Sequence, residues 1–254
     1  MSRLLVSTFI RMLKKVIFWV LVLCMFAYGV YSALNIASEA RIGFVLDGCL
    51  FECLPMMGLI SAIFTSLFIG SEYSDGTIRN KIIVGHSRIR IYLANFIVCA
   101  IASVLFSLSY TVGVFVIGNM NGGELITETG TIFLCMISSL MISVTFASIM
   151  TLLAILNTNK AGNVVVSMIL ALVLLVSGSF IHQKLGEPKL YDNYVTVNEM
   201  GIPTQIEQLP NPQYIEGTPR IVLEVLSDLL PSGQAIQLAD AFDTEGMTDE
   251  SIAN

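Results

Sequence analysis

The sequence predicts an all-α integral membrane protein, with an in-plane N-terminal helix, five transmembrane helices and a polar segment after them. Three observations lead to this class. Of the 254 residues, 55% are hydrophobic and only 13% are charged, which leaves too little polar surface for a soluble protein of this length. Five long apolar stretches contain no Asp, Glu, Lys or Arg, namely residues 16–37, 53–70, 91–120, 131–157 and 161–182. Lys and Arg are concentrated in alternate gaps between these stretches.

Residues 1–15 are predicted to form an amphipathic helix lying in the membrane plane. On a helical wheel the two kinds of residue separate, with Leu5, Val6, Phe9, Met12 and Leu13 on one side and Arg3, Arg11, Lys14 and Lys15 on the other. The apolar side of such a helix sinks to the acyl boundary, and its basic side meets anionic headgroups. The alternative is that these residues are only the positive flank of the first span.

The apolar stretches are each long enough to cross a bilayer, which takes about 20 residues in a helix. The expected spans are residues 16–37, 49–70, 91–119, 131–157 and 161–182, so that the transmembrane domain covers residues 16–182. The first stretch is too long for the core of a removable signal peptide, and no small-residue cleavage pattern follows it. The five cysteines lie in or beside these stretches, which favours ordinary apolar packing over disulfides or a metal site.

The distribution of Lys and Arg predicts which side of the membrane each loop faces. One set of segments contains Arg3, Arg11, Lys14, Lys15, Arg79, Lys81, Arg88, Arg90 and Lys160, whereas the short loops of the other set contain only Arg41. Positive residues near span ends stay in the cytoplasm, so the N-terminus is expected there and residues 183–254 outside. Most carboxylates fall on the outer side, so the net charge of −6 gives no reason to expect nucleic-acid binding.

Within the outer segment, a helix is predicted to begin at Thr218 and Pro219. Val222, Val225, Leu226 and Leu229 would form its apolar face, and Arg220, Glu224, Ser227 and Asp228 the opposite one. Such a helix would pack on the outer mouth of the bundle or lie along the outer leaflet. Residues 240–254 are expected to be weakly ordered.

The loop at residues 71–90 contains the most specific local pattern. Asp75 is predicted to cap the N-terminus of a short helix, in which Ile78 and Ile82 share an apolar face. Gly85 is predicted to end this helix in a left-handed conformation, and Ser87 to cap the third span. A helix of about two turns is marginal in water, so the spans, the headgroups or a partner must hold it. The loop is therefore a candidate docking element, or else a stiff linker with a positive topology anchor.

The residues of this loop also match a known pattern. Glu72 follows the second span, Gly76, Thr77, Ile78 and Arg79 come next, and Ser87 and Arg88 precede the third span. In this respect the chain resembles the permease subunits of type-two ATP-binding-cassette (ABC) exporters. The in-plane helix, the span order and the outer segment extend the resemblance over nearly the whole chain. It implies that residues 71–90, with Asp75, Lys81 and Ile82 among them, form a coupling helix that docks on a separate nucleotide-binding subunit.

The resemblance also implies a division of labour between subunits. The chain has no G-x-x-x-x-G-K-[S/T] phosphate loop, so it is expected to be no enzyme and to hold no cofactor, with ATP and Mg²⁺ bound by partner ATPase subunits. A second permease subunit, identical or similar, would complete a multi-pass transporter in a bacterial plasma membrane. Such permeases have six spans, so a sixth span is expected to be missing from this sequence.

The expected activity is export by alternating access of a hydrophobic or amphipathic substrate, with a weak preference for an antimicrobial peptide or drug because the spans offer apolar surface and few charges. An ion-coupled secondary transporter and a non-transporting scaffold or sensor remain as alternatives. Glu52 is a candidate outer-site charge near Asp47. Ser139, Ser143, Ala147 and Thr151 repeat every four residues in the fourth span and are predicted to serve helix packing or a transport pathway.

Overall fold

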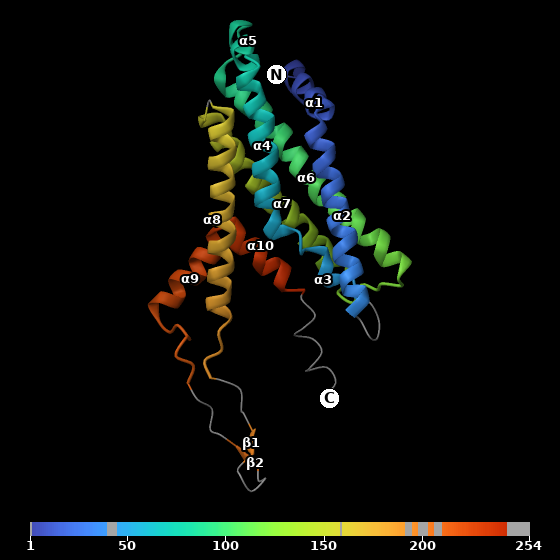
Figure 1. Ribbon diagram of the computed structural model, residues 1–254, viewed down its shortest axis with the longest axis vertical. Helices are drawn as coiled ribbons and strands as arrows, with labels where there is room; N and C mark the ends of the chain where they lie inside the picture. The colour runs from blue at the N-terminus through green and yellow to red at the C-terminus, as the bar shows by residue number, and fades with distance from the viewer. Residues whose placement is uncertain are drawn as a thin grey trace.

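A bundle of five long helices dominates the structure, a computed structural model that describes residues 2–39, 45–157, 159–190, 195–197, 203–205 and 210–242. Each of the five is long and apolar enough to cross a membrane. They are α2 (Val16–Glu39), α4 (Met57–Ser74) with the short elements before it, α6 (Arg88–Met120), α7 (Thr129–Leu156) and α8 (Lys160–Gly186) (Figure 1). The prediction of an all-α membrane protein with five spans is therefore confirmed.

The second span, expected at residues 49–70, is interrupted near its beginning. It starts with α3 (Asp47–Leu50), continues through the 3₁₀ turn η1 (Leu54–Met56) and becomes regular only in α4. Pro55 lies inside η1, and a proline cannot donate the backbone hydrogen bond that a continuing helix needs. Cys49 in α3 and Cys53 just before η1 are both buried. All five cysteines are free thiols.

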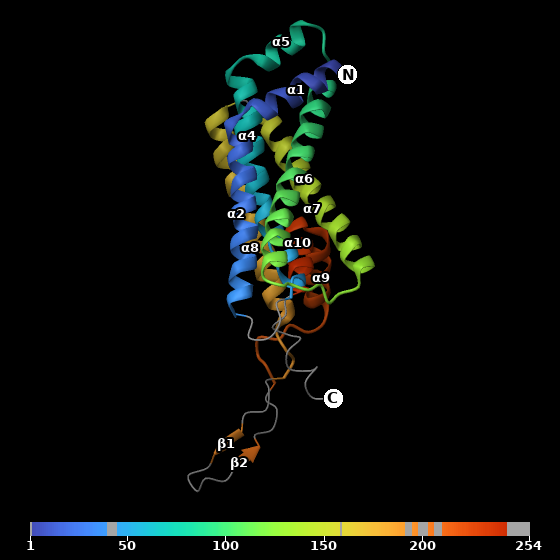
Figure 2. The ribbon, with the colours of Figure 1, turned by 90° about the vertical axis from the view of Figure 1, so that its right-hand side faces the viewer.

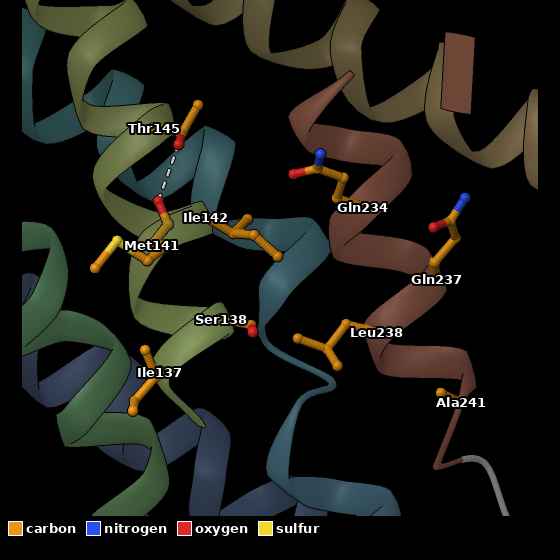
Figure 3. A pocket seen from close by; sticks show the side chains of 9 residues that line it. All are labelled: Ile137, Ser138, Met141, Ile142, Thr145, Gln234, Gln237, Leu238 and Ala241. Carbon is orange, nitrogen blue, oxygen red and sulfur yellow. Dashed lines mark hydrogen bonds between the residues drawn. The ribbon is translucent and has the colours of Figure 1, made fainter. Parts of the chain in front are cut away.

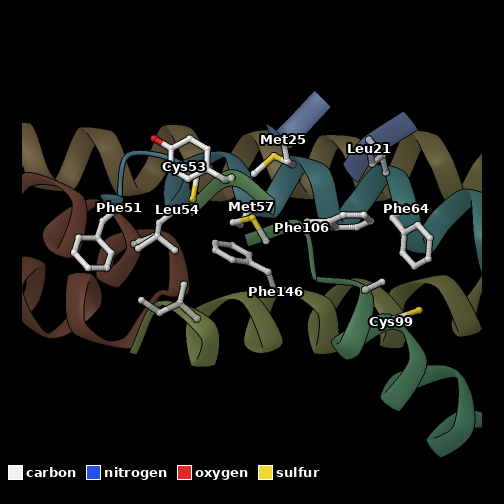
Figure 4. Close-up of a cluster of buried hydrophobic side chains, with 14 of the residues drawn as sticks. Leu21, Met25, Phe51, Cys53, Leu54, Met57, Phe64, Cys99, Phe106 and Phe146 are labelled. Carbon is white, nitrogen blue, oxygen red and sulfur yellow. The ribbon is translucent and has the colours of Figure 1, made fainter. Parts of the chain in front are cut away.

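The buried core is aromatic and runs along the contact between four of the spans. Phe64 of α4 packs edge-to-face on Phe106 of α6, with ring centroids 5.4 Å apart. Leu21 and Met25 of α2 and Phe146 of α7 close around them (Figure 4). In contrast, α8 leaves a row of large apolar side chains uncovered, including Val173, Val176 and Phe180. An apolar interior together with an apolar outer surface is the arrangement that a lipid environment requires.

The N-terminal helix α1 (Ser2–Lys14) is separate from α2 and inclined to it, at the same end of the bundle as α5 (Thr77–Ile83) (Figure 2). Its buried residues, Leu4, Thr8 and Met12, lie on the side toward α6, with which α1 makes most of its contacts. The apolar Val6 and Leu13 are exposed on the part of the surface that a membrane could cover. The predicted placement of Arg11 on an outer basic face is wrong, because its side chain turns inward to a buried carboxylate.

The opposite end of the bundle holds the elements that follow α8. A small antiparallel ladder pairs β1 (Val195–Val197) with β2 (Pro203–Gln205). The predicted helix is present as α9 (Thr218–Leu229), and its apolar face is exposed. Ser227, predicted on the face opposite the apolar one, is buried where Gly233 of α10 approaches it, and its Oγ accepts a hydrogen bond from Gln237 Nε2 at 2.8 Å. Of the predicted weakly ordered tail, residues 243–254 lie outside the described residues.

A further helix, α10 (Pro231–Asp240), was not predicted from the sequence. It turns back toward the bundle and packs against α7, α8 and η1 (Figure 1). A Cβ on Gly178 of α8 would lie 2.9 Å from Ser232 Cβ, so the two helices meet closely there. His182 Nε2 lies 3.1 Å from Asp240 Oδ2, and this contact joins the C-terminal parts of α8 and α10.

Asp47 ties the beginning of the second span to the α6–α7 connection. Its side chain is buried, and Oδ2 accepts backbone hydrogen bonds from Ile126 at 3.2 Å and Thr127 at 2.7 Å. The backbone N–H of Leu46 adds a bond of 3.0 Å to the carbonyl of Glu124. These contacts fix two loops that are distant in sequence.

Replacing Asp47 with alanine is expected to lower the free energy of unfolding by about 2 kcal/mol, because two charge-assisted hydrogen bonds to the α6–α7 connection are lost. Thermal denaturation in detergent measures this change. Glu124→Ala is the matched control, since only the backbone of Glu124 takes part in these contacts and its side chain is exposed. Equal melting of the two variants would contradict a structural role for the Asp47 carboxylate.

Candidate functional site

Glu72, near the end of α4, is the centre of a buried polar cluster at the end of the bundle that carries α1 and α5. Its side chain has no exposed surface. Oε1 accepts a hydrogen bond from Lys81 Nζ at 2.6 Å and another from the Arg11 guanidinium. Oε2 accepts a bond of 2.7 Å from Asn95 Nδ2. One carboxylate thereby connects α1, α4, α5 and α6.

The energetics of burial make this connection strong. A buried charge is tolerated only when it is paired and hydrogen-bonded, and removing one partner typically costs several kcal/mol. The Arg11 guanidinium is held further by the ring of Phe68, whose centroid is 4.9 Å away. By contrast, α5 itself has no buried residue. The position of α5 therefore depends largely on the bond between Lys81 and Glu72 and on the two turns that connect it to the spans.

Two glycines shape those turns. Gly76 has φ of 66° and Gly85 has φ of 95°, both in the left-handed region that favours glycine. The left-handed stop at Gly85 confirms one prediction, and Ser87 confirms another, since its Oγ accepts from the backbone N–H of Arg90 at 3.4 Å and caps α6. The predicted N-cap is wrong. Asp75 lies at the C-terminal end of α4, and Gly76 begins α5 without a side-chain cap.

The other predicted loop residues fall on different sides of α5. Arg79 is exposed, as are the apolar Ile83 and Val84, which the sequence did not single out. Thr77 and Lys81 line a cleft of about 300 Å³ between α5 and α1, to which Arg3 also contributes. The side of α5 with Ile78 and Ile82 faces the bundle and lines a separate cavity, together with Arg88.

Of the predicted loop residues, Glu72 and Lys81 are joined by a side-chain hydrogen bond in the described structure. Sequence reasoning missed Arg11 and Asn95, the other two members of the cluster. Asn95 could have been noticed as a lone carboxamide early in the apolar third span. Arg11 offered no comparable signal, because it lies among other basic residues of a short helix.

The two predictions within the spans concern Glu52 and the small residues of α7. Glu52 is exposed between α3 and η1, where it accepts a hydrogen bond from Ser32 Oγ, and in the described structure it is not joined to the buried Asp47. All four residues of the stripe are buried: Ser139, Ser143, Ala147 and Thr151. Ser103 Oγ of α6 donates to the carbonyl of Ser143 at 3.0 Å and lies 3.0 Å from Ser61 Oγ of α4. In the described structure the stripe thus lies in the packing between α4, α6 and α7.

A shallow groove of about 560 Å³ lies between α7 and α10 (Figure 3). The wall from α7 is mostly apolar, with Ile137, Met141 and Ile142. The wall from α10 adds the carboxamides of Gln234 and Gln237. Among the described residues that line this groove none is charged, and this lining suits a neutral or apolar molecule. Among the described residues, no group of His, Cys, Asp and Glu could hold a metal ion.

The five apolar helices, each long enough to cross a membrane, define a multi-pass helical membrane protein. Residues 5–178 match the family described as ABC-2 family transporter protein, and the chain belongs to this family. It is an ABC permease, as the residues of the loop suggested. The matched region includes most of α1, all of α5, four whole spans and most of α8. Comparison with curated proteins and with solved structures gave no match.

Proposed function

We propose that this chain is the transmembrane permease subunit of an ATP-driven exporter and that α5 is its coupling helix. The observation that carries the proposal is the buried Glu72 cluster. A force applied to α5 would pass through Lys81 to α4, and from Glu72 to α1 and α6 through Arg11 and Asn95. Such a connection suits alternating access, in which a movement at one end rearranges the spans.

The proposed partners are two ATPase subunits, which bind ATP and Mg²⁺, and a second permease subunit. The exposed face of α5, with Arg79, Ile83 and Val84, is the surface offered to the ATPase. Large apolar side chains at the tip of a polar loop are typical of a protein contact. This end is placed in the cytoplasm because Arg and Lys are concentrated there, and the membrane is taken to be a bacterial plasma membrane.

The proposed substrate is hydrophobic or amphipathic, such as an antimicrobial peptide or a drug. The groove between α7 and α10 supports this class, since its described lining consists of apolar side chains, hydroxyls and carboxamides. The few ionisable residues within the spans likewise offer little to a small charged solute.

The docking role of α5 is tested by purifying the intact protein from its native membrane in a mild detergent and identifying the proteins that remain bound. An ATP-binding subunit is expected with the natural sequence and should be lost in Ile83→Asp. Ile126→Asp is the matched control, because Ile126 is 71% exposed in a loop at the other end and Ile83 is 72% exposed. Failure to recover any ATP-binding subunit, or equal recovery with both variants, would contradict the proposal.

A further inference from the structure

A cavity of about 360 Å³ lies between α5 and the ends of the spans. Ile78 and Ile82 of α5 form one side, and Tyr92 of α6 and Ile155 of α7 contribute to the other. Its volume falls within the range of roughly 300–1,000 Å³ that is usual for ligand sites. The walls are mainly apolar, and the polar cluster around Glu72 adjoins them through Asn95.

The cavity has two polar groups that lack a partner within the described residues. Asn95 is fully buried, and while its Nδ2 donates to Glu72, its Oδ1 accepts no hydrogen bond. Arg88 lines the cavity and forms no ion pair there. The adjoining cluster adds two cations against one carboxylate, so positive charge is in excess. An anion that also offers a hydroxyl donor would satisfy both groups.

The level of the cavity along the spans indicates the source of such an anion. The apolar part of α6 starts at Ile91, one turn after Arg88, and α7 ends at Leu156, just beyond Ile155. The cavity therefore lies where apolar helix gives way to charged ends, the level at which lipid phosphate and glycerol groups meet the acyl chains. Basic pockets between helices at this level are suited to anionic lipid headgroups.

We propose that this cavity binds one anionic phospholipid from the adjacent leaflet. The phosphate pairs with Arg88, a headgroup hydroxyl donates to Asn95, and the upper part of an acyl chain packs on the isoleucines. The lipid would lie between α5 and the α6–α7 wall, so its presence would set how freely α5 moves. The binding itself requires no ATPase partner and is tested on the permease alone.

The test is native mass spectrometry of the intact protein in detergent, with phosphatidylglycerol and phosphatidylcholine of identical acyl chains. One phosphatidylglycerol per chain should be retained, about tenfold more tightly than phosphatidylcholine. Both lipids carry a phosphate, but in phosphatidylcholine the choline ammonium offsets its charge and is repelled by Arg88. Arg88→Gln should abolish the preference. Arg90→Gln should keep it, because Arg90 is two residues away and does not line the cavity. Equal retention of the two lipids, or a preference that survives Arg88→Gln, would overturn the proposal.

A second measurement covers the case in which Arg88→Gln does not fold. Trp19 is the only tryptophan, so Trp19→Phe with Tyr92→Trp places a single reporter in the cavity wall. Phosphatidylglycerol with brominated acyl chains should quench this tryptophan at a lower lipid fraction than brominated phosphatidylcholine. Equal quenching would mean that only bulk membrane lipid reaches Tyr92, and no quenching would mean that a protein segment fills the cavity. Either result would refute the lipid site.

Discussion

Replacing Gly113 with valine is expected to destabilise the bundle by about 3 kcal/mol, the upper end of the usual cost of overpacking. Gly29 of α2 and Gly113 of α6 mark the closest approach of these helices. A Cβ on Gly113 would lie 2.5 Å from the carbonyl oxygen of Phe26, and one on Gly29 would overlap the carbonyl oxygen of Tyr110. The obstructing atoms belong to backbone, so no rotamer change relieves the overlap and the helices must separate.

The melting temperature in detergent is the measurement. A loss of this size should lower it by about 10 °C, and Gly113→Ala should give a smaller shift in the same direction. The matched control is Gly130→Ala in the first turn of α7, where the nearest atom to an added Cβ is 3.9 Å away. Gly130→Ala should be neutral or slightly stabilising because alanine favours the helix. If Gly113→Ala melts like the natural protein, α2 and α6 are not in close contact there.

The sequence was a good guide to the spans because lipid imposes one simple demand. A helix that crosses a bilayer needs an unbroken apolar stretch, and such a stretch is visible without any knowledge of its neighbours. The errors arose where local geometry decides. Pro55 divides the second span into α3, η1 and α4, although the composition of residues 49–70 reads as continuous. Similarly, α10 has no clear apolar period of its own, and its contacts with α7, α8 and η1 hold it in place.

The candidate site was predictable only in part, because its residues meet through tertiary contacts. Glu72 and Lys81 could be named, as they lie close together in one loop. Arg11 and Asn95 are 61 and 23 residues away from Glu72 in sequence, and nothing local indicates that they share its carboxylate. The proposed cap at Asp75 failed for a related reason. The left-handed Gly76 already lets the chain reverse after α4, which leaves Asp75 outside the new helix.

Changing Glu72 to glutamine tests whether the buried carboxylate holds α1 and α5 on the bundle. Arg11 and Lys81 would then be charges without an anion, and breaking a buried pair in this way costs about 3–5 kcal/mol. A fall of about 10 °C in the melting temperature is expected. Hydrogen exchange followed by mass spectrometry should also show faster exchange of the α5 amides, because α5 has no buried residue to keep it in place.

Two further variants separate the charge effect from a loss of packing. Asp75→Asn neutralises the exposed carboxylate three residues away and should change neither measurement. The triple variant Arg11→Met, Glu72→Leu and Lys81→Met replaces the whole ionic group with apolar side chains, a change that is often neutral or stabilising. It should recover the melting temperature while α5, without its ionic link to α4, still exchanges faster than in the natural protein. If Glu72→Gln has the melting temperature and the α5 exchange rates of the natural protein, the carboxylate does not link these helices. The proposed relay would then lose its central residue.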